Sequence, residues 1–158
     1  MMAKRRQIPS SFWRKMRAFS GRLISLLERG KGPKRLVLLL TTTGRKSGLP
    51  RQTPLQYEEH LGILYVASAR GQQADWFKNL VVNPQVHVRI GGQIVAALAE
   101  PICDPARIAD FLEVRLRRHP VMMRLIMFAE GLPFRYSRAD LEKFARDKAI
   151  AALHPCDQ

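Results

Sequence analysis

The sequence predicts an α+β fold, an antiparallel β-barrel that is closed or split and carries helices at its ends. Short turns separate the first three predicted strands, and such turns join antiparallel strands but cannot make parallel crossovers. The pair Gly91-Gly92 separates two further alternating segments, as in a two-residue hairpin. Strands and helices do not alternate along the chain, which excludes a doubly wound parallel sheet.

Strand boundaries follow from β-branched runs, alternation and turn residues. Strands are expected at residues 36–43, 53–59, 63–68, 86–90, 93–99 and 150–153. Helices are expected at residues 74–82, 105–118, 121–129 and 137–148. Asp104 before Pro105 is a typical helix start, and Ser137 with Asp140 resembles a capping box. The apolar run 121–128 predicts packing in a helical core, with the lining of a substrate pocket as the alternative.

The chain divides into a basic N-terminal segment, residues 1–35, and a barrel domain with C-terminal helices, residues 36–158. Residues 1–9 form a basic arm, and an amphipathic helix is expected to run from Ser10 or Ser11 to about Arg29. Its apolar stripe with basic flanks suits two roles, covering the edge of its own sheet or lying on an anionic membrane.

Charge is concentrated in the first third of the chain. Residues 1–51 carry 14 Lys and Arg against one acid, so nearly all of the formal net charge of +14 lies there. Such a field favours an anionic partner, whether nucleic acid, an acidic membrane surface or a polyanionic small molecule. No apolar run reaches the roughly 18 residues of a membrane span, and no secretory signal is evident, so a cytoplasmic protein is expected. Cys103 and Cys156 lack metal-ligand spacing, and no metal site is expected.

The stretch TTTGRKSGLPR, residues 41–51, raises the question of phosphate binding. A P-loop is excluded, because position 41 is threonine where that motif needs glycine and a strand rather than a helix follows. Gly44 and Gly48 permit positive φ, which would let backbone amides converge into an anion-binding nest beside the cations of this stretch. From the residues alone, an anion site and an ordinary solvated hairpin turn both remain open.

Two later segments offer further polar groups. Ser68 and Arg70 end a predicted strand, and Asn79 lies on the following helix, where it could bind a heterocycle or cap its own helix. No base adjoins Ser68 and no GxSxG elbow is present, so hydrolysis is excluded. Glu58 precedes a turn and is expected to be solvated, and His87 is expected to face solvent.

Together these segments resemble the deazaflavin (F420)-dependent nitroreductase family, a branch of the split β-barrel flavin and deazaflavin oxidoreductases. The matching stretches are LLLTTTGRKSGLPRQTPL (38–55), YVASARG (65–71) and ADWFKNLVVNPQVHVRIGG (74–92). The resemblance implies a split, FMN-binding-like barrel and binding of coenzyme F420, whose phosphate and oligoglutamate tail form a polyanion. The C-terminal third departs from the family pattern.

The resemblance also implies site residues. The cofactor-binding set is Leu39, Leu40, Thr41, Arg45, Lys46, Ser47, Gly48, Leu49, Pro50, Arg51, Ala67, Ser68, Arg70, Asp75, Trp76, Phe77 and Asn79. Residues 45–51 match the turn that grips phosphate and tail, and residues 75–79 match the helix that closes over the ring. Ser68 and Tyr136 are the candidate catalytic residues, which would hydrogen-bond the acceptor and assist its protonation.

The implied function is an F420H2-dependent oxidoreductase that passes a hydride to a quinone, nitroaromatic or enone. An FMN-binding reductase on the same barrel is the nearest alternative, and a basic nucleic-acid-binding module is a weaker one. The implied assembly is a homodimer. Residues 1–30 could hold the enzyme at the inner face of an anionic membrane, as a peripheral protein.

Overall fold

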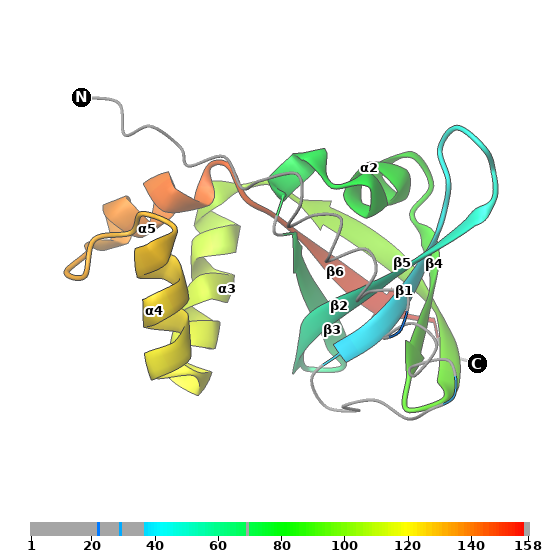
Figure 1. Cartoon of the computed structure of the whole chain (residues 1–158), viewed down its shortest axis with the longest axis horizontal. Helices are drawn as coiled ribbons and strands as arrows, with labels where there is room; N and C mark the ends of the chain where they lie inside the picture. Colours follow the sequence, from blue (N-terminus) through cyan, green and yellow to red (C-terminus); the bar gives the residue numbers. More distant parts are fainter. Residues whose placement is uncertain (1–21, 23–28, 30–36, 69, 157–158) are drawn as a thin grey trace.

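Within residues 37–68 and 70–156 of the computed structural model, six strands close into an antiparallel β-barrel, with helices packed beside it (Figure 1). The structure describes residues 22, 29, 37–68 and 70–156. The strands are β1 Val37–Thr43, β2 Pro50–His60, β3 Ile63–Ser68, β4 Gln85–Ile90, β5 Gln93–Ile102 and β6 Ala149–Pro155. The helices are η1 Gly71–Gln73, α2 Asp75–Val82, α3 Pro105–Arg118, α4 Pro120–Ala129 and α5 Arg138–Ala145. The predicted fold class is confirmed, whereas the predicted basic arm and helix of residues 1–35 lie almost wholly outside the described residues.

The barrel runs in the order β1-β2-β3-β6-β5-β4, and β4 pairs back onto β1. The β1-β2-β3 meander and the β4-β5 hairpin are as predicted. The last strand, β6, inserts between β3 and β5, with Val66 opposite Ala151 and Ala99 opposite Leu153. Strand β2 begins at Pro50 rather than at residue 53, because Thr43 already pairs with Pro50 across the turn.

One core fills the barrel. Alternate residues of every strand point inward, and helix α2 closes one end with Trp76, Phe77 and Leu80. Trp76 and Phe77 meet edge to face, with ring centroids 5.8 Å apart. The predicted anchoring of α2 by Trp76 and Leu80 is confirmed. The helix therefore has a fixed position relative to the β1–β2 turn beside it.

A second core lies between the outer face of the barrel and helices α3–α5. It joins Ile102, Ile150 and Ala152 of the sheet to the apolar faces of the three helices. Asp104 caps α3 through its bond from the Ala106 amide, and Ser137 with Asp140 forms the predicted capping box of α5. Helix α5 ends at Ala145, earlier than expected, because the chain must straighten to enter β6.

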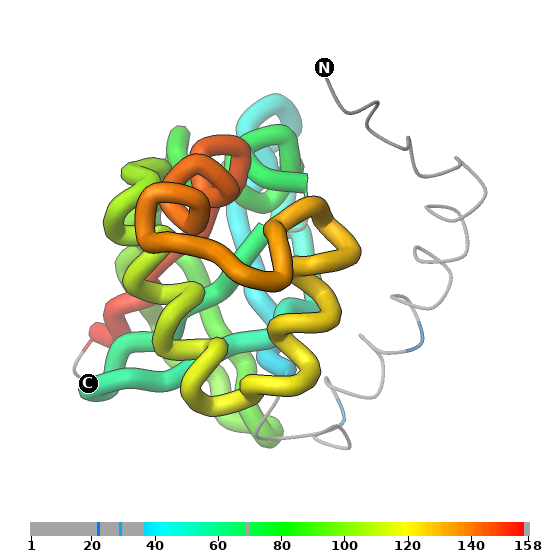
Figure 2. The backbone as a smooth tube through the Cα atoms, turned by 90° about the vertical axis from the view of Figure 1, so that its left-hand side faces the viewer, coloured from blue at the N-terminus to red at the C-terminus, as the bar shows by residue number. Residues whose placement is uncertain are grey.

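Helices α3, α4 and α5 gather at one end of the molecule, apart from α2, which lies over the barrel (Figures 1 and 2). In Figure 2 the α4 segment and the loop that follows it face the viewer, on the outside of the helical layer. The β1–β2 turn projects at the opposite end of the molecule in Figure 1. The two ends therefore present separate surfaces.

Candidate functional site

The β1–β2 turn is held by its own backbone. The Gly44 amide donates to the Leu49 carbonyl and the Gly48 amide donates to the Gly44 carbonyl, both at 2.8 Å. Gly48 has a φ of 68°, in the left-handed region that favours glycine. A Cβ on Gly44 would lie 2.7 Å from Ser47 Oγ and 3.1 Å from the Leu49 carbonyl, so the turn packs closely against this position.

Gly44 and Gly48 do not form the anion nest that was expected around them. Gly44 is not in the left-handed region, and the amides of Gly44, Gly48 and Leu49 already donate within the turn, that of Leu49 to Ser47 Oγ. These three amides are therefore not free to hold an anion.

Asn79 of α2 fixes the turn from inside. Its side-chain carbonyl accepts from the Arg45 amide at 3.2 Å and from Arg45 Nη1 at 3.0 Å. Its amide nitrogen donates to Thr42 Oγ1 at 3.2 Å, and that hydroxyl donates to the Arg51 carbonyl at 3.4 Å. Asn79 and Thr42 are both buried. The side chain thus does not cap its own helix, and its bonds join α2, β1 and β2.

Arg45 is engaged on both sides of its guanidinium. In addition to its bond to Asn79, Arg45 donates from Nη2 to the Asp75 carboxylate at 3.0 Å and from Nη1 to the Asp75 main-chain carbonyl at 3.4 Å. The hydrogen bond from Arg45 lowers the pKa of Asp75 below its usual value, more than partial burial raises it. The geometry makes Arg45 a residue that positions the turn, and leaves direct anion contact to its neighbours.

A cleft of about 470 Å³ opens between the turn and α2. Its walls are the turn, the start of β2 and the N-terminal part of α2. They comprise Gly44, Arg45, Lys46, Ser47, Arg51, Gln52, Thr53, Asp75, Trp76 and Asn79. Lys46 and Arg51 form no ion pair with any other residue that the structure describes, in contrast to Arg45. Two uncommitted cations and one hydroxyl therefore face a single cleft, a donor set that suits phosphate or carboxylate groups.

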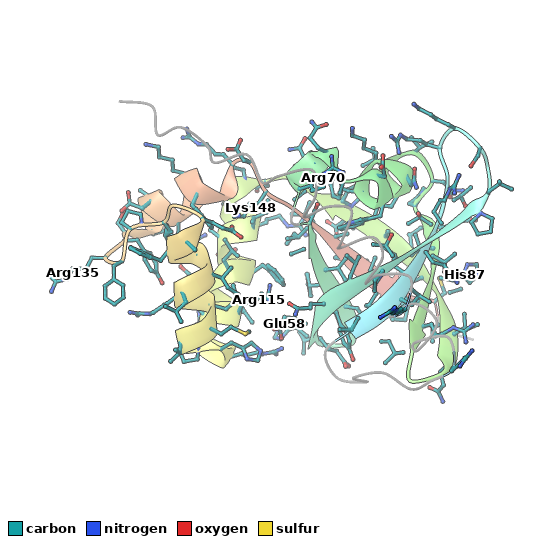
Figure 3. The ribbon with its side chains drawn as sticks, in the orientation of Figure 1. Glu58, Arg70, His87, Arg115, Arg135 and Lys148 are labelled. Atoms are coloured by element: carbon teal, nitrogen blue, oxygen red, sulfur yellow. The ribbon has the colours of Figure 1, made fainter. Side chains whose placement is uncertain are left out.

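The other predicted cofactor-binding residues differ in their location and burial. Leu40 and Phe77 pack inside the barrel core, so a ligand on the outer surface could reach only their backbone. Leu39 is also buried, whereas Thr41 is half-buried and Leu49 and Pro50 are exposed at the turn. Arg70 lies beside η1, on the same side of the molecule as α2 (Figure 3). Ala67 packs toward the helical core instead.

The two candidate catalytic residues lie in different parts of the structure. Ser68 ends β3 with its side chain in the barrel, where Oγ is buried without a hydrogen-bond partner among the described residues. Tyr136 lies in the α4–α5 loop and packs against the helical core, at the opposite end of the molecule from the β1–β2 turn (Figure 1). Their catalytic roles stay predictions, and within one chain the structure does not bring the two side chains together.

A charged cluster that the sequence did not predict joins the barrel to α3. Glu58 of β2 is largely buried, not solvated, and lies 3.6 Å from Arg115 Nε, 2.8 Å from Arg118 Nη1 and 3.3 Å from His119 Nε2. Figure 3 shows Arg115 pointing toward Glu58 across the gap between α3 and the sheet. These partners are about sixty residues apart in sequence, so no local pattern could reveal them. His87, by contrast, is exposed as predicted and points away from the barrel (Figure 3).

Neither a metal cluster nor a membrane-spanning helix is found in the described part of the chain. No three His, Cys, Asp or Glu side chains there come together in a way that could hold an ion. Among the same residues, every helix is too short or too polar to cross a bilayer. Cys103 and Cys156 are free and exposed.

Comparison with known proteins identifies the family. A family model described as F420H(2)-dependent quinone reductase matches residues 11–124. An F420H(2)-dependent quinone reductase of Mycobacterium tuberculosis is 32% identical over 68 residues, which cover 41% of this chain and 46% of that protein. The chain thus spans about half the length of the curated relatives it matches.

Two solved structures share the fold. A protein described as an F420 reductase superposes with a TM-score of 0.50 at 20% identity, over 84% of this chain and 92% of that one. The heme storage protein HutZ of Vibrio cholerae gives 0.54 at 17% identity, over 85% and 89%. At these identities the structures support the split barrel alone.

The family model covers well over half of the sequence and includes the β1–β2 turn and α2. The chain therefore belongs to the F420H(2)-dependent quinone reductase family, a family of oxidoreductases that use coenzyme F420.

Proposed function

We propose that this protein is an F420H2-dependent reductase whose cleft between the β1–β2 turn and α2 holds the anionic part of the coenzyme. The observation that carries the proposal is the pair of cations, Lys46 and Arg51, on one cleft and without ion-pair partners among the described residues. By contrast, Arg107, Arg115 and Arg138 are each paired with a carboxylate in the described structure.

The residues fit the phosphate and carboxylate groups of this coenzyme. Lys46 and Arg51 would supply charge-assisted hydrogen bonds, and Ser47 a hydroxyl donor. Arg45, held by Asn79 and Asp75, keeps the turn in the shape that directs those groups into the cleft. Trp76 forms part of the apolar wall and would exclude water from one side of the ligand.

When bound, reduced F420 supplies a hydride from C5 of its deazaflavin ring. The protein's contribution is to bind the tail, to orient the ring and to keep water away from the reacting atoms. Ser68 and Tyr136 are the residues proposed to donate a proton to the acceptor. In support, Ser68 Oγ is buried and has no hydrogen-bond partner among the described residues. The proposed acceptors are electron-poor small molecules, with quinones first and nitroaromatics and enones as further substrates.

Titration of the purified protein with F420, followed by the fluorescence of the coenzyme, tests the binding step. Saturable binding at micromolar coenzyme is expected, with FMN binding at least about tenfold weaker. FMN binding without F420 binding would assign the cleft to a flavin and overturn the proposal. Binding of F420 without oxidation of F420H2 by any quinone, nitroaromatic or enone would keep the coenzyme site and reject the acceptor class.

The predicted homodimer and the predicted membrane contact of residues 1–30 remain predictions. Sedimentation velocity of the full chain checks the first. Sedimentation with anionic vesicles checks the second.

A further inference from the structure

Helix α4 exposes most of its circumference, and what it exposes is apolar. Met123 and Met127 point into the helical core. The remaining large apolar side chains face outward, namely Val121 (72% exposed), Met122 (46%), Leu125 (65%), Ile126 (43%) and Phe128 (58%). The expected burial of this run in a core is therefore wrong for all but Met123 and Met127 among its large apolar side chains.

The exposed residues form a continuous face, which we call the α4 face. Val121, Leu125 and Phe128 follow at i, i+4 and i+7 along one line of the helix, with Met122 and Ile126 beside them. Phe134, from the loop after α4, is 67% exposed and meets Phe128 edge to face with ring centroids 6.5 Å apart. This contact places the loop next to the helix and extends the same face.

The charged residues of the segment 114–136, which contains α4, are almost all positive. Residues 114–136 contain five arginines and a single acid, Glu130. Glu130 is already paired with Lys148, and Arg115 and Arg118 are paired with Glu58. Arg124, the only charged residue of α4, and Arg135 form no ion pair with the residues that the structure describes. Arg135 points outward beyond the α4–α5 loop (Figure 3).

We propose that the α4 face lies on an anionic lipid surface, with its apolar side chains in the headgroup and upper acyl region and Arg124 and Arg135 on lipid phosphates. Ten residues are half the length that a span needs, so the helix would lie in the plane of the interface. Apolar side chains exposed together with unpaired arginines match such a surface in both hydrophobicity and charge.

A second copy of the chain fits this face less well. In a two-fold interface each copy presents the same patch, so unpaired arginines would approach their own counterparts without acids to offset them. The location also separates the α4 face from the β1–β2 turn, which borders the proposed coenzyme cleft and lies at the other end of the molecule (Figure 1). Membrane docking through α4 would leave that cleft open to a water-soluble, anionic coenzyme.

Sedimentation of the full chain with vesicles of equimolar phosphatidylcholine and phosphatidylglycerol tests the proposal. The unmodified protein should co-sediment with these vesicles and much less with phosphatidylcholine alone. The double variant L125S/F128S should lower the partition coefficient by about tenfold or more. The control I94S/L98S removes two large apolar side chains that are about half exposed on β5, and should bind as the unmodified protein does.

A charge variant tests the same face by another route. R124E/R135E should lose binding to the anionic vesicles, while K143E/R146E, with the same net charge but located on and just after α5, should retain most of it. Unchanged binding of L125S/F128S or of R124E/R135E would overturn the proposal and assign any vesicle binding to another part of the chain, such as residues 1–30. Dissociation of a dimer by L125S/F128S in the absence of vesicles would overturn it too, and would make the α4 face an interface between copies.

Discussion

The side-chain carbonyl of Asn79 accepts two hydrogen bonds from Arg45, one from the main-chain amide at 3.2 Å and one from Nη1 at 3.0 Å. These bonds connect a buried side chain of α2 to an exposed turn thirty-four residues earlier in the chain. The turn is therefore held in place by the helix, and the direction of its cations depends on a residue that does not itself need to touch a ligand.

Replacing Asn79 with leucine should destabilise the protein by about 1–3 kcal/mol, because Thr42 and Arg45 lose a buried partner. Urea unfolding measures this change. N83A is the control, since the Asn83 side chain accepts a hydrogen bond from the nearby Gln85 amide in an exposed position. A double variant T42V/N79L should cost less than the sum of its single changes, and strict additivity would contradict the coupling.

Asp75 should add a small acid-dependent contribution to stability. Its pKa is lowered in the folded state, so the contribution is complete above the unfolded carboxyl pKa and is lost as pH falls through the folded value. The window therefore lies below about pH 4. Because three quarters of the Asp75 side chain is exposed, the effect is small.

The unmodified protein and D75N are compared by their unfolding midpoints, measured at a pH above this window and at a pH within it. D75N should show the weaker fall in stability on acidification. An R45A variant should show the same reduced slope, and a slope equal to that of the unmodified protein in both variants would contradict the pairing.

Glu58 should matter for stability more than other carboxylates on the helical side. E58Q would leave Arg115, whose Nε is buried, without its charged partner, and a loss of about 1–3 kcal/mol is expected. E113Q is the matched control, because Glu113 is more exposed and its pairs, with Arg138 at 2.9 Å and with Arg117 at 3.8 Å, lie near the surface. Equal unfolding midpoints for the two variants would show that the Glu58 cluster does not hold α3 to the barrel.

Two glycines with similar backbone angles should tolerate alanine very differently. Gly62 has a φ of 77° and open space around it, so G62A should cost only about 1–2 kcal/mol of backbone strain. Gly71 has a φ of 60°, and a Cβ there would collide with the Asp147 carbonyl, so G71A should cost clearly more. Thermal unfolding compares the two, and equal losses would mean that η1 moves freely relative to the entry of β6.

Much of the fold could be predicted because its signals are local. The short turns predicted the β1-β2-β3 meander, the Gly91-Gly92 pair predicted the β4-β5 hairpin, and Ser137 with Asp140 predicted the start of α5. The place of β6 between β3 and β5 could not be predicted in this way, because it depends on closure of the whole barrel.

The predicted coenzyme site stays a prediction, but part of its geometry can be compared with the structure. Of the predicted residues, Arg45, Lys46, Ser47, Arg51, Asp75, Trp76 and Asn79 border one cleft, whereas Phe77 is buried in the barrel core. Arg45 and Asn79 turn out to bond each other, and Gly44 serves close packing rather than a nest. Such roles depend on which side chains the closed barrel brings together, and the spacing of residues along one strand or helix does not contain that information.

The β1–β2 cleft as the coenzyme site is tested most directly by F420 titration of the variant K46A/R51A, with K143A/R146A as a control of equal net charge. K46A/R51A should weaken F420 binding by about tenfold to a hundredfold, more at low salt than at high salt, with an unchanged unfolding midpoint. The control should bind F420 as the unmodified protein does. Equal affinity for F420 in K46A/R51A and the unmodified protein, at low salt, would contradict the assignment of this cleft to the coenzyme.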